Sequence, residues 1–133
     1  MTQEEKQLLL KDLCARLPYG IKVRLEGKPR IVFGVQETLV IVRARNEKGG
    51  WEWDEYDIEE WNIKPYLRPM SSMTEEEREE FENFLEGIVD GVERWDKPDL
   101  CEEYDWLNKN HFDYRGLIPM GLALEAAEGM YIK

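Results

Sequence analysis

Cysteine and histidine are scarce in this sequence of 133 residues. Its two cysteines, Cys14 and Cys101, are too few for a disulfide framework, and they form no Cys-x-x-Cys pair of the kind that binds zinc or does thiol redox chemistry. We expect each of them to be a small buried hydrophobic residue. A Gly-x-Ser-x-Gly elbow, a Walker loop and a Gly-x-Gly-x-x-Gly run are also absent from the sequence. The sequence therefore shows none of the familiar motifs for hydrolysis, nucleotide binding or thiol chemistry. We expect neither a metal nor another cofactor.

The only histidine, His111, stands two residues before Asp113. A general base must lie within hydrogen-bond reach of its proton, and a metal site needs several ligands, so this pair alone defines neither. The favoured interpretation is that His111 caps the end of a preceding helix, where a positive charge is stabilised. The sequence therefore predicts a protein that is not an enzyme, with catalysis by His111 and Asp113 as an alternative.

No apolar stretch approaches the roughly 18 residues that a membrane span requires. The first residues, Met1–Glu5, lack the basic and then apolar order of a secretory signal. We therefore expect a cytoplasmic protein that does not bind a membrane. The net charge of −11 disfavours generic attraction to nucleic acid or to anionic lipid.

The N-terminal half shows a change from helical to strand periodicity. Thr2 and Glu5 form a capping-box pattern before an apolar stripe at helical spacing, which predicts a helix that ends at Pro18-Tyr19-Gly20. Apolar residues then alternate with polar ones. We expect strands near residues 21–26, 30–36, 39–45 and 51–54, and a fifth strand or a turn of helix at 58–63. These elements predict a small SH3-like barrel or a curled antiparallel sheet of four to five strands.

The C-terminal half contains residue patterns that start and end helices. Pro65 and Pro69 are expected to break the chain, and the capping-box pair Thr74 and Glu77 begins a helix for which Gly91 is the expected stop. A third helix is expected from residue 99. The fold class is therefore α+β, with a helix and β part at residues 1–70. Residues 71–133 are expected to form a helical extension packed on that part as one compact unit.

Aromatic residues crowd among acids between residues 51 and 61. They are Trp51, Trp53, Tyr56 and Trp61. Tryptophan and tyrosine are enriched among the residues that dominate the energy of protein interfaces, so these four form the predicted partner-binding site. The alternative is that two of the tryptophans fill the mouth of a barrel. The leading functional prediction is a non-enzymatic accessory protein that acts by binding another protein.

A second candidate site is basic. Residues 21–45 carry six bases and two acids, a local charge of +4 in an acidic chain. Four of these bases lie at alternating positions of the predicted strands, namely Lys22, Arg24, Arg43 and Arg45. Small barrels use basic and aromatic faces to bind nucleotides or single-stranded nucleic acid, which is the alternative function. The competing interpretation is that the two arginines pair across the sheet with Glu52 and Asp54.

The glutamates between Glu75 and Glu86 have two interpretations as well. The favoured one is a solvated face of the predicted helix. The functional one is an acidic surface that mimics a nucleic-acid backbone or binds a basic surface of a partner protein. Sequence spacing does not separate these interpretations.

Three segments carry a resemblance to other proteins. They are Leu17-Pro18-Tyr19-Gly20-Ile21-Lys22-Val23, the stretch from Ile63 to Glu77 (IKPYLRPMSSMTEEE) and the stretch from Asn110 to Ala123 (NHFDYRGLIPMGLA). With these strings the chain resembles a group of uncharacterised small proteins of phages and prophages of gut bacteria, whereas residues 45–62 and 88–105 depart from that pattern. The resemblance implies a bacterial cytoplasm and a role in binding host or phage components. It implies no activity and no catalytic residues.

Overall fold

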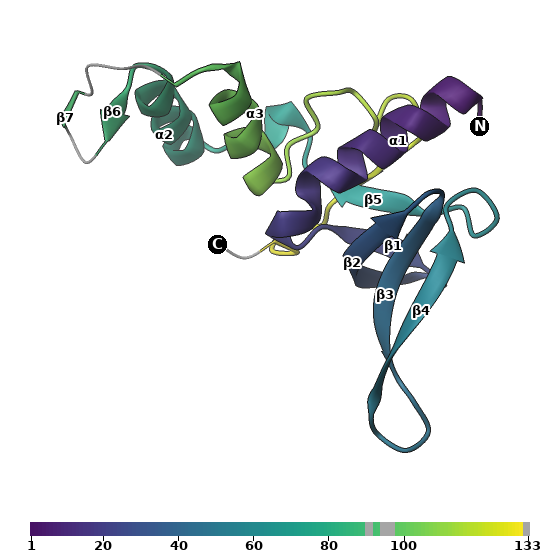
Figure 1. The fold of residues 1–133 in the computed structure, drawn as a ribbon. Helices are drawn as coiled ribbons and strands as arrows, with labels where there is room; N and C mark the ends of the chain where they lie inside the picture. Colours follow the sequence, from purple (N-terminus) through teal and green to yellow (C-terminus); the bar gives the residue numbers. More distant parts are fainter. Residues whose placement is uncertain (90–91, 94–97, 132–133) are drawn as a thin grey trace.

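A computed structural model describes residues 1–89, 92–93 and 98–131, which form an α+β fold (Figure 1). The helices are α1 (Gln3–Arg16), α2 (Glu75–Leu85) and α3 (Leu100–Lys109), with short 3-10 turns at Leu17–Tyr19 and Met70–Ser72. The strands are β1 (Lys22–Leu25), β2 (Lys28–Gln36), β3 (Leu39–Arg45), β4 (Trp51–Asp57), β5 (Lys64–Leu67), β6 (Ile88–Val89), β7 (Val92–Glu93) and β8 (Leu124–Glu125). Figure 1 shows α1 lying across the sheet, with α2 and α3 to one side of it.

The predicted N-terminal helix is confirmed. The Thr2 hydroxyl accepts a hydrogen bond from the Glu5 amide at 3.0 Å, and the Glu5 carboxylate accepts one from the Thr2 amide at 2.8 Å, which satisfies two amides that the first turn leaves unpaired. Its buried stripe includes Leu9 and Leu13. Cys14 is exposed, contrary to the prediction, because successive helix residues are about 100° apart and the stripe passes through Leu13 instead. The other cysteine, in the first turn of α3, is exposed too.

Within the described residues, the larger sheet contains six strands in the order β4-β3-β2-β1-β5-β8. Neighbouring strands from β4 to β5 are antiparallel, and β8 is parallel to β5. The sheet is not closed, and it is mixed rather than antiparallel, with more strands than the four or five expected. The α+β class is therefore confirmed, whereas the SH3-like barrel is not. Residues 58–63 form a turn, and Pro65 lies within β5 opposite Val23, although it was expected to end the β part.

The described part of the chain has a core of two hydrophobic clusters. The larger one lies between α1 and the sheet, and it contains Leu9, Leu13, Ile21, Val23, Leu25, Val32, Val40, Val42, Ile58, Ile63, Leu67, Leu117, Leu122 and Ala123. The smaller one contains Trp106, Leu107 and Phe112, with half-buried Phe81 and Phe84 of α2 packed against it. The predicted starts of α2 and α3 are confirmed by side-chain caps at Thr74 and Asp99. The expected stop at Gly91 lies outside the described residues, and α2 ends at Leu85.

A buried ion network joins α1 to the segment after α3. Asp12 and Arg16 have no exposed side-chain area, and the Arg16 guanidinium donates to both Asp12 oxygens at 3.0 and 3.1 Å. It also donates to the Phe112 carbonyl at 2.7 Å, while Arg115 donates to Asp12 at 3.1 Å. This network fixes the loop that carries His111.

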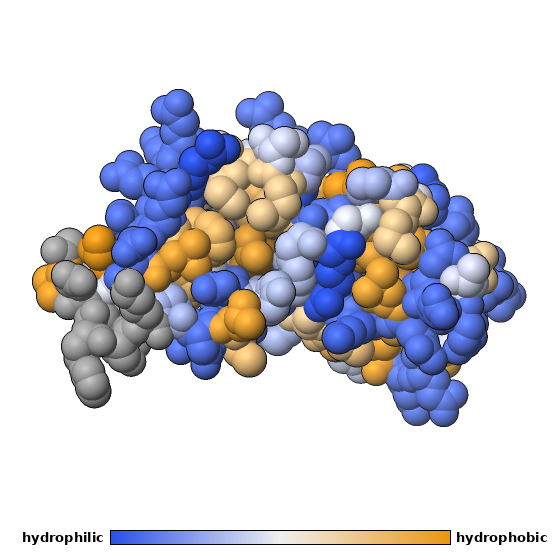
Figure 2. All heavy atoms as spheres, turned by 90° about the horizontal axis from the view of Figure 1, so that it is seen from above, coloured by the Kyte–Doolittle hydropathy of each residue, from blue (hydrophilic) through white to orange (hydrophobic). Residues whose placement is uncertain are grey.

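The upper surface of the molecule is largely hydrophilic, with apolar side chains in separate patches between the polar ones (Figure 2). In the part of the chain that the structure describes, no helix has the length and apolar character needed to cross a membrane.

Candidate functional site

The most distinctive surface lies on the outer face of β2, β3 and β4. In the hairpin of β3 and β4, Arg43 lies opposite Trp53, and Arg45 lies opposite Trp51. Residues directly opposite each other on antiparallel strands share a face. The register therefore places two arginines and two tryptophans together, on the side of the sheet away from the buried valines of the core.

Two of the four acids of β4 lie on the other face. Glu52 is opposite Ala44, and Asp54 is opposite the buried Val42. Side chains alternate along a strand, so neither carboxylate is directed towards the arginine side chains of β3. The prediction that Glu52 and Asp54 pair with the two arginines across the sheet is therefore wrong.

The arginines stack on the aromatic rings instead. The Arg43 guanidinium lies 4.3 Å from the centroid of the Trp51 ring and 5.8 Å from that of Trp53, and the Arg45 guanidinium lies 4.6 Å from the Trp51 centroid. Each such contact at an exposed site is worth about 0.5–1 kcal/mol, so together they restrict the orientation of the rings. Trp51 and Trp53 nevertheless keep 55% and 61% of their surface exposed.

β2 extends this surface. Phe33 lies 5.6 Å from Trp53 in an edge-to-face arrangement, 5.7 Å from the Arg43 guanidinium, and is 50% exposed. It stands at a β-bulge, where the pairing of β2 with β3 shifts between Val32 and Gly34. We call this surface the arginine–tryptophan face; it consists of Ile31, Phe33, Arg43, Arg45, Trp51 and Trp53.

The other two aromatic residues of the predicted partner-binding site lie elsewhere. Tyr56 is on the opposite face of β4 from Trp53, half-buried against the core. Its ring contacts Trp61 edge to face at 4.9 Å, and Trp61 is 44% exposed in the turn after β4. Burial raises the pKa of the Tyr56 hydroxyl, and the nearby Asp54 charge adds to this effect. The four predicted residues thus form two separate pairs.

The predicted basic patch is also divided. Lys22 lies opposite Ile31, so Lys22 and Arg24 belong to the outer side of the sheet. The Lys22 ammonium, however, donates to the Met130 carbonyl at 2.9 Å and lies 5.7 Å from the Tyr131 ring. Lys22 is thus bound to the C-terminal segment, whereas Arg43 and Arg45 contact the tryptophans, and Arg24 lies on the same outer side of the sheet.

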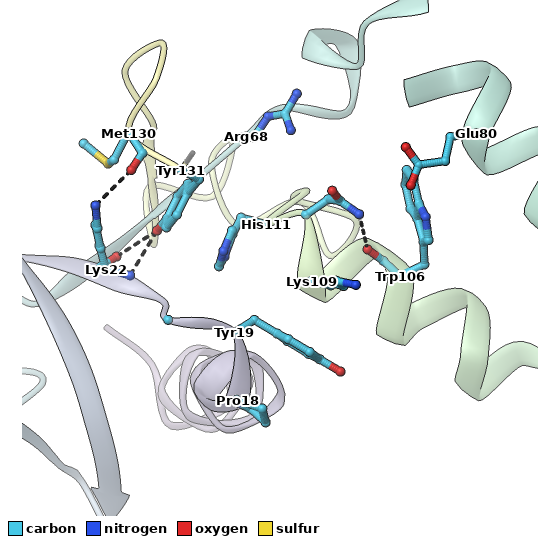
Figure 3. A pocket seen from close by; sticks show the side chains of 12 residues that line it. Pro18, Tyr19, Lys22, Arg68, Glu80, Trp106, Lys109, His111, Met130 and Tyr131 are labelled. Atoms are coloured by element: carbon cyan, nitrogen blue, oxygen red, sulfur yellow. Dashed lines mark hydrogen bonds between the residues drawn. The ribbon is translucent and has the colours of Figure 1, made fainter. Parts of the chain in front are cut away.

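His111 borders a cavity of about 720 Å³ (Figure 3). The lining includes Tyr19, Lys22, Arg68, Lys109 and Tyr131. Tyr131 stacks on the His111 ring with centroids 3.7 Å apart, and its hydroxyl donates to the Tyr66 carbonyl at 2.7 Å. The C-terminal segment is thereby held against the sheet and the His111 loop.

The backbone at His111 ends α3. Its φ of 61° is in the left-handed region, and the amides of His111 and Phe112 donate to the carbonyls of Asn108 and Leu107, which is a Schellman motif. The predicted position at the helix end is confirmed. The prediction that His111 carries a positive charge there is wrong. Burial, and then the charges of Arg16, Arg68 and Lys22, lower the His111 pKa to about 4. Sequence reasoning missed these cations because they come from three distant segments.

Asp113 has a different environment from His111. Its carboxylate accepts hydrogen bonds from the amides of Leu117 at 2.8 Å and Ile118 at 2.9 Å. These bonds explain how a carboxylate is accommodated at 7% exposure in this loop. Both of its oxygens therefore have structural partners.

The acidic helix α2 supplies one buried carboxylate. Glu77 receives a bidentate pair of hydrogen bonds from Arg68, at 2.6 and 2.7 Å. Glu75, Glu76 and Glu79 are exposed. Within the described residues, no group of three His, Cys, Asp or Glu side chains is arranged to hold a metal ion.

Comparison of the chain with protein-family models, with curated proteins and with solved structures finds no match.

Proposed function

We propose that this protein is a non-enzymatic accessory protein that binds another protein through the arginine–tryptophan face. The observation that carries the proposal is the stacking of two arginines on two half-exposed tryptophans at the outer face of the sheet. Tryptophan, tyrosine and arginine dominate the binding energy of protein interfaces. Rings that are already held in place lose little conformational freedom when a partner covers them.

The exposed aromatic area of this surface is smaller than the area that a stable protein interface covers. Three half-exposed rings offer about 300 Å² of aromatic surface, since a fully buried aromatic side chain covers about 150–250 Å². A stable interface covers about 800 Å² on each partner. The partner therefore extends beyond Phe33, Trp51 and Trp53, onto neighbouring parts of β2 and β4.

The resemblance to small phage and prophage proteins supports a partner in the bacterial cytoplasm. The test is affinity purification from the lysate of a gut bacterium, with the protein as bait. Recovery of a specific partner is expected to be lost with Trp53→Ala and retained with Trp61→Ala, a matched loss of an exposed tryptophan outside the face. Equal recovery with both variants would contradict the site.

A second candidate function is the binding of single-stranded nucleic acid by the same face. The stacked arginines and exposed rings favour it, because bases stack on aromatic rings and phosphates bind arginine. The net charge of −11 and the exposed Glu52 and Glu55 on β4 oppose it. This function predicts oligonucleotide binding that weakens steeply with salt and is reduced by Arg43→Ala. An absence of oligonucleotide binding at low salt would exclude it.

A further inference from the structure

β4 is an edge strand with seven residues. It is the first strand in the sheet order, and among the described strands it pairs only with β3. Figure 1 shows that the β3–β4 hairpin projects away from the helices. An exposed edge strand of this length presents backbone groups that can pair with another extended chain.

Two hydrogen bonds determine which backbone groups face the free edge. At one end of the hairpin the Asn46 amide donates to the Gly50 carbonyl at 2.9 Å, and beyond the other end the Ile58 amide donates to the Thr38 carbonyl at 3.0 Å. Antiparallel pairs alternate between bonded and non-bonded, so the bonded positions of β4 are the even-numbered ones. The amides and carbonyls of Trp51, Trp53 and Glu55 therefore point away from β3.

Side-chain chemistry differs on the two sides of this edge. On one side lie the rings of Trp51 and Trp53, followed by the Glu55 carboxylate, and on the other side lie the carboxylates of Glu52 and Asp54. A strand added beside β4 would place alternate side chains next to the rings and next to the carboxylates. Apolar residues complement the rings, and basic residues complement the acids.

A second copy of this chain is poorly suited to pair with the free edge of β4. Pairing two β4 strands would bring together the four acids that each strand carries, Glu52, Asp54, Glu55 and Asp57. Each chain also has a net charge of −11. Like charges opposite each other destabilise strand pairing, so charge complementarity selects a basic partner.

We propose that the free edge of β4 binds an extended segment of the partner protein as an additional strand, in which Lys or Arg alternates with apolar residues. This inference rests on the proposed function and specifies the chemistry of the partner. Backbone hydrogen bonds to Trp51, Trp53 and Glu55 align the segment. The rings of the arginine–tryptophan face cover its apolar side, and Glu52 and Asp54 bind its basic side.

The probe is a blocked peptide of about nine residues in which Lys and Val alternate, long enough to span β4. Binding is followed by the backbone amide signals of the full chain in NMR titrations. The peptide is expected to shift the Trp53 and Glu55 amides and to slow their exchange. A peptide of alternating Glu and Val is expected not to bind. Two N-methylated forms of the Lys–Val peptide are also titrated, one methylated at the valines and one at the lysines. Binding is expected to be lost only with the form in which the methyl groups occupy the peptide amides that pair with β4.

The matching change in the protein is Glu55→Pro, with Glu55→Ala as its control. Both variants remove the carboxylate, but only proline removes the outward amide, and proline is tolerated where the amide does not serve the strand's own ladder. Glu55→Pro is expected to weaken peptide binding about tenfold relative to Glu55→Ala. The N-methylated peptides test the same bonds with the unchanged protein, should Glu55→Pro fail to fold.

Three results would overturn the inference: no binding of the Lys–Val peptide, equal binding of all N-methylated forms, or dimerisation of the free chain through β4. None of them removes the proposed function if Trp53→Ala still abolishes recovery of the partner from lysate. If that recovery is unchanged by Trp53→Ala, the proposed function fails, whatever the peptide does.

Discussion

Acidification from pH 7 to pH 5 is expected to destabilise the protein through His111. Its pKa is about 4 in the folded chain, compared with an ordinary value of 6.5. Folding therefore favours the neutral ring. The stability that this preference provides is fully present above pH 6.5, and it is lost as the pH falls towards 4 because the unfolded chain binds the proton first.

The size of the effect follows from the two pKa values. Proton linkage gives a loss of about 2 kcal/mol in the free energy of unfolding between pH 7 and pH 5, and of about 3 kcal/mol by pH 4. Glu5 and Asp57 also have lowered pKa values, but their ordinary values of 4.5 and 3.8 place their effects mainly below pH 5. The window from pH 7 to pH 5 therefore isolates the histidine.

The assay is urea unfolding at pH 7, 6 and 5, followed by circular dichroism, for the original chain and for His111→Asn. Asparagine does not titrate, and it tolerates the left-handed backbone found at this position. The original chain is expected to lose about 2 kcal/mol relative to the variant across this range. His111 is the only histidine, so a proton NMR titration reads its pKa directly. Parallel stability curves, or a measured pKa near 6.5, would refute the reasoning.

Two further changes test the contacts that hold the C-terminal segment. Asp12→Ala leaves the fully buried Arg16 guanidinium without its carboxylate and is expected to cost about 3–5 kcal/mol in urea unfolding, whereas the exposed Asp105→Ala is expected to change stability by less than about 0.5 kcal/mol. Tyr131→Phe keeps the ring stacked on histidine but removes the hydrogen bond to the Tyr66 carbonyl, and is expected to cost about 1–3 kcal/mol in the same assay. Equal stability of the two aspartate variants, or an unchanged Tyr131→Phe protein, would contradict these assignments.

Local signals predicted the helix starts because caps involve residues close together in sequence. The pair Thr2 and Glu5 and the pair Thr74 and Glu77 are each three residues apart, and both form the expected capping boxes. The exposure of Cys14 was not predictable in this way. Which side of α1 meets the sheet depends on packing against strands that follow it, and Cys14 lies just outside the buried stripe.

The pairing of the arginines with tryptophans rather than acids depends on the register of one hairpin. A loop of five residues, from Asn46 to Gly50, places Arg45 opposite Trp51, and so odd-numbered residues opposite odd-numbered ones. The sequence contains this loop, but a loop one residue longer, with Trp51 included in it, would have placed Glu52 opposite Arg45. A one-residue difference in register exchanges the faces of a strand, which is why the composition of the stretch did not determine the site.

The same alternation explains how an acidic chain can present a surface of arginine and aromatic rings. In β4 the carboxylates of Glu52 and Asp54 lie on one side of the strand, and the rings of Trp51 and Trp53 lie on the other side with the arginines and Glu55. The net charge of −11 acts over roughly the Debye length of about 10 Å at 0.1 M salt, and it favours the approach of a basic partner. The contacts of the arginine–tryptophan face act only after that approach. Added salt should therefore slow association with a basic partner more than it speeds dissociation, because the charged groups guide the encounter and the rings retain the partner.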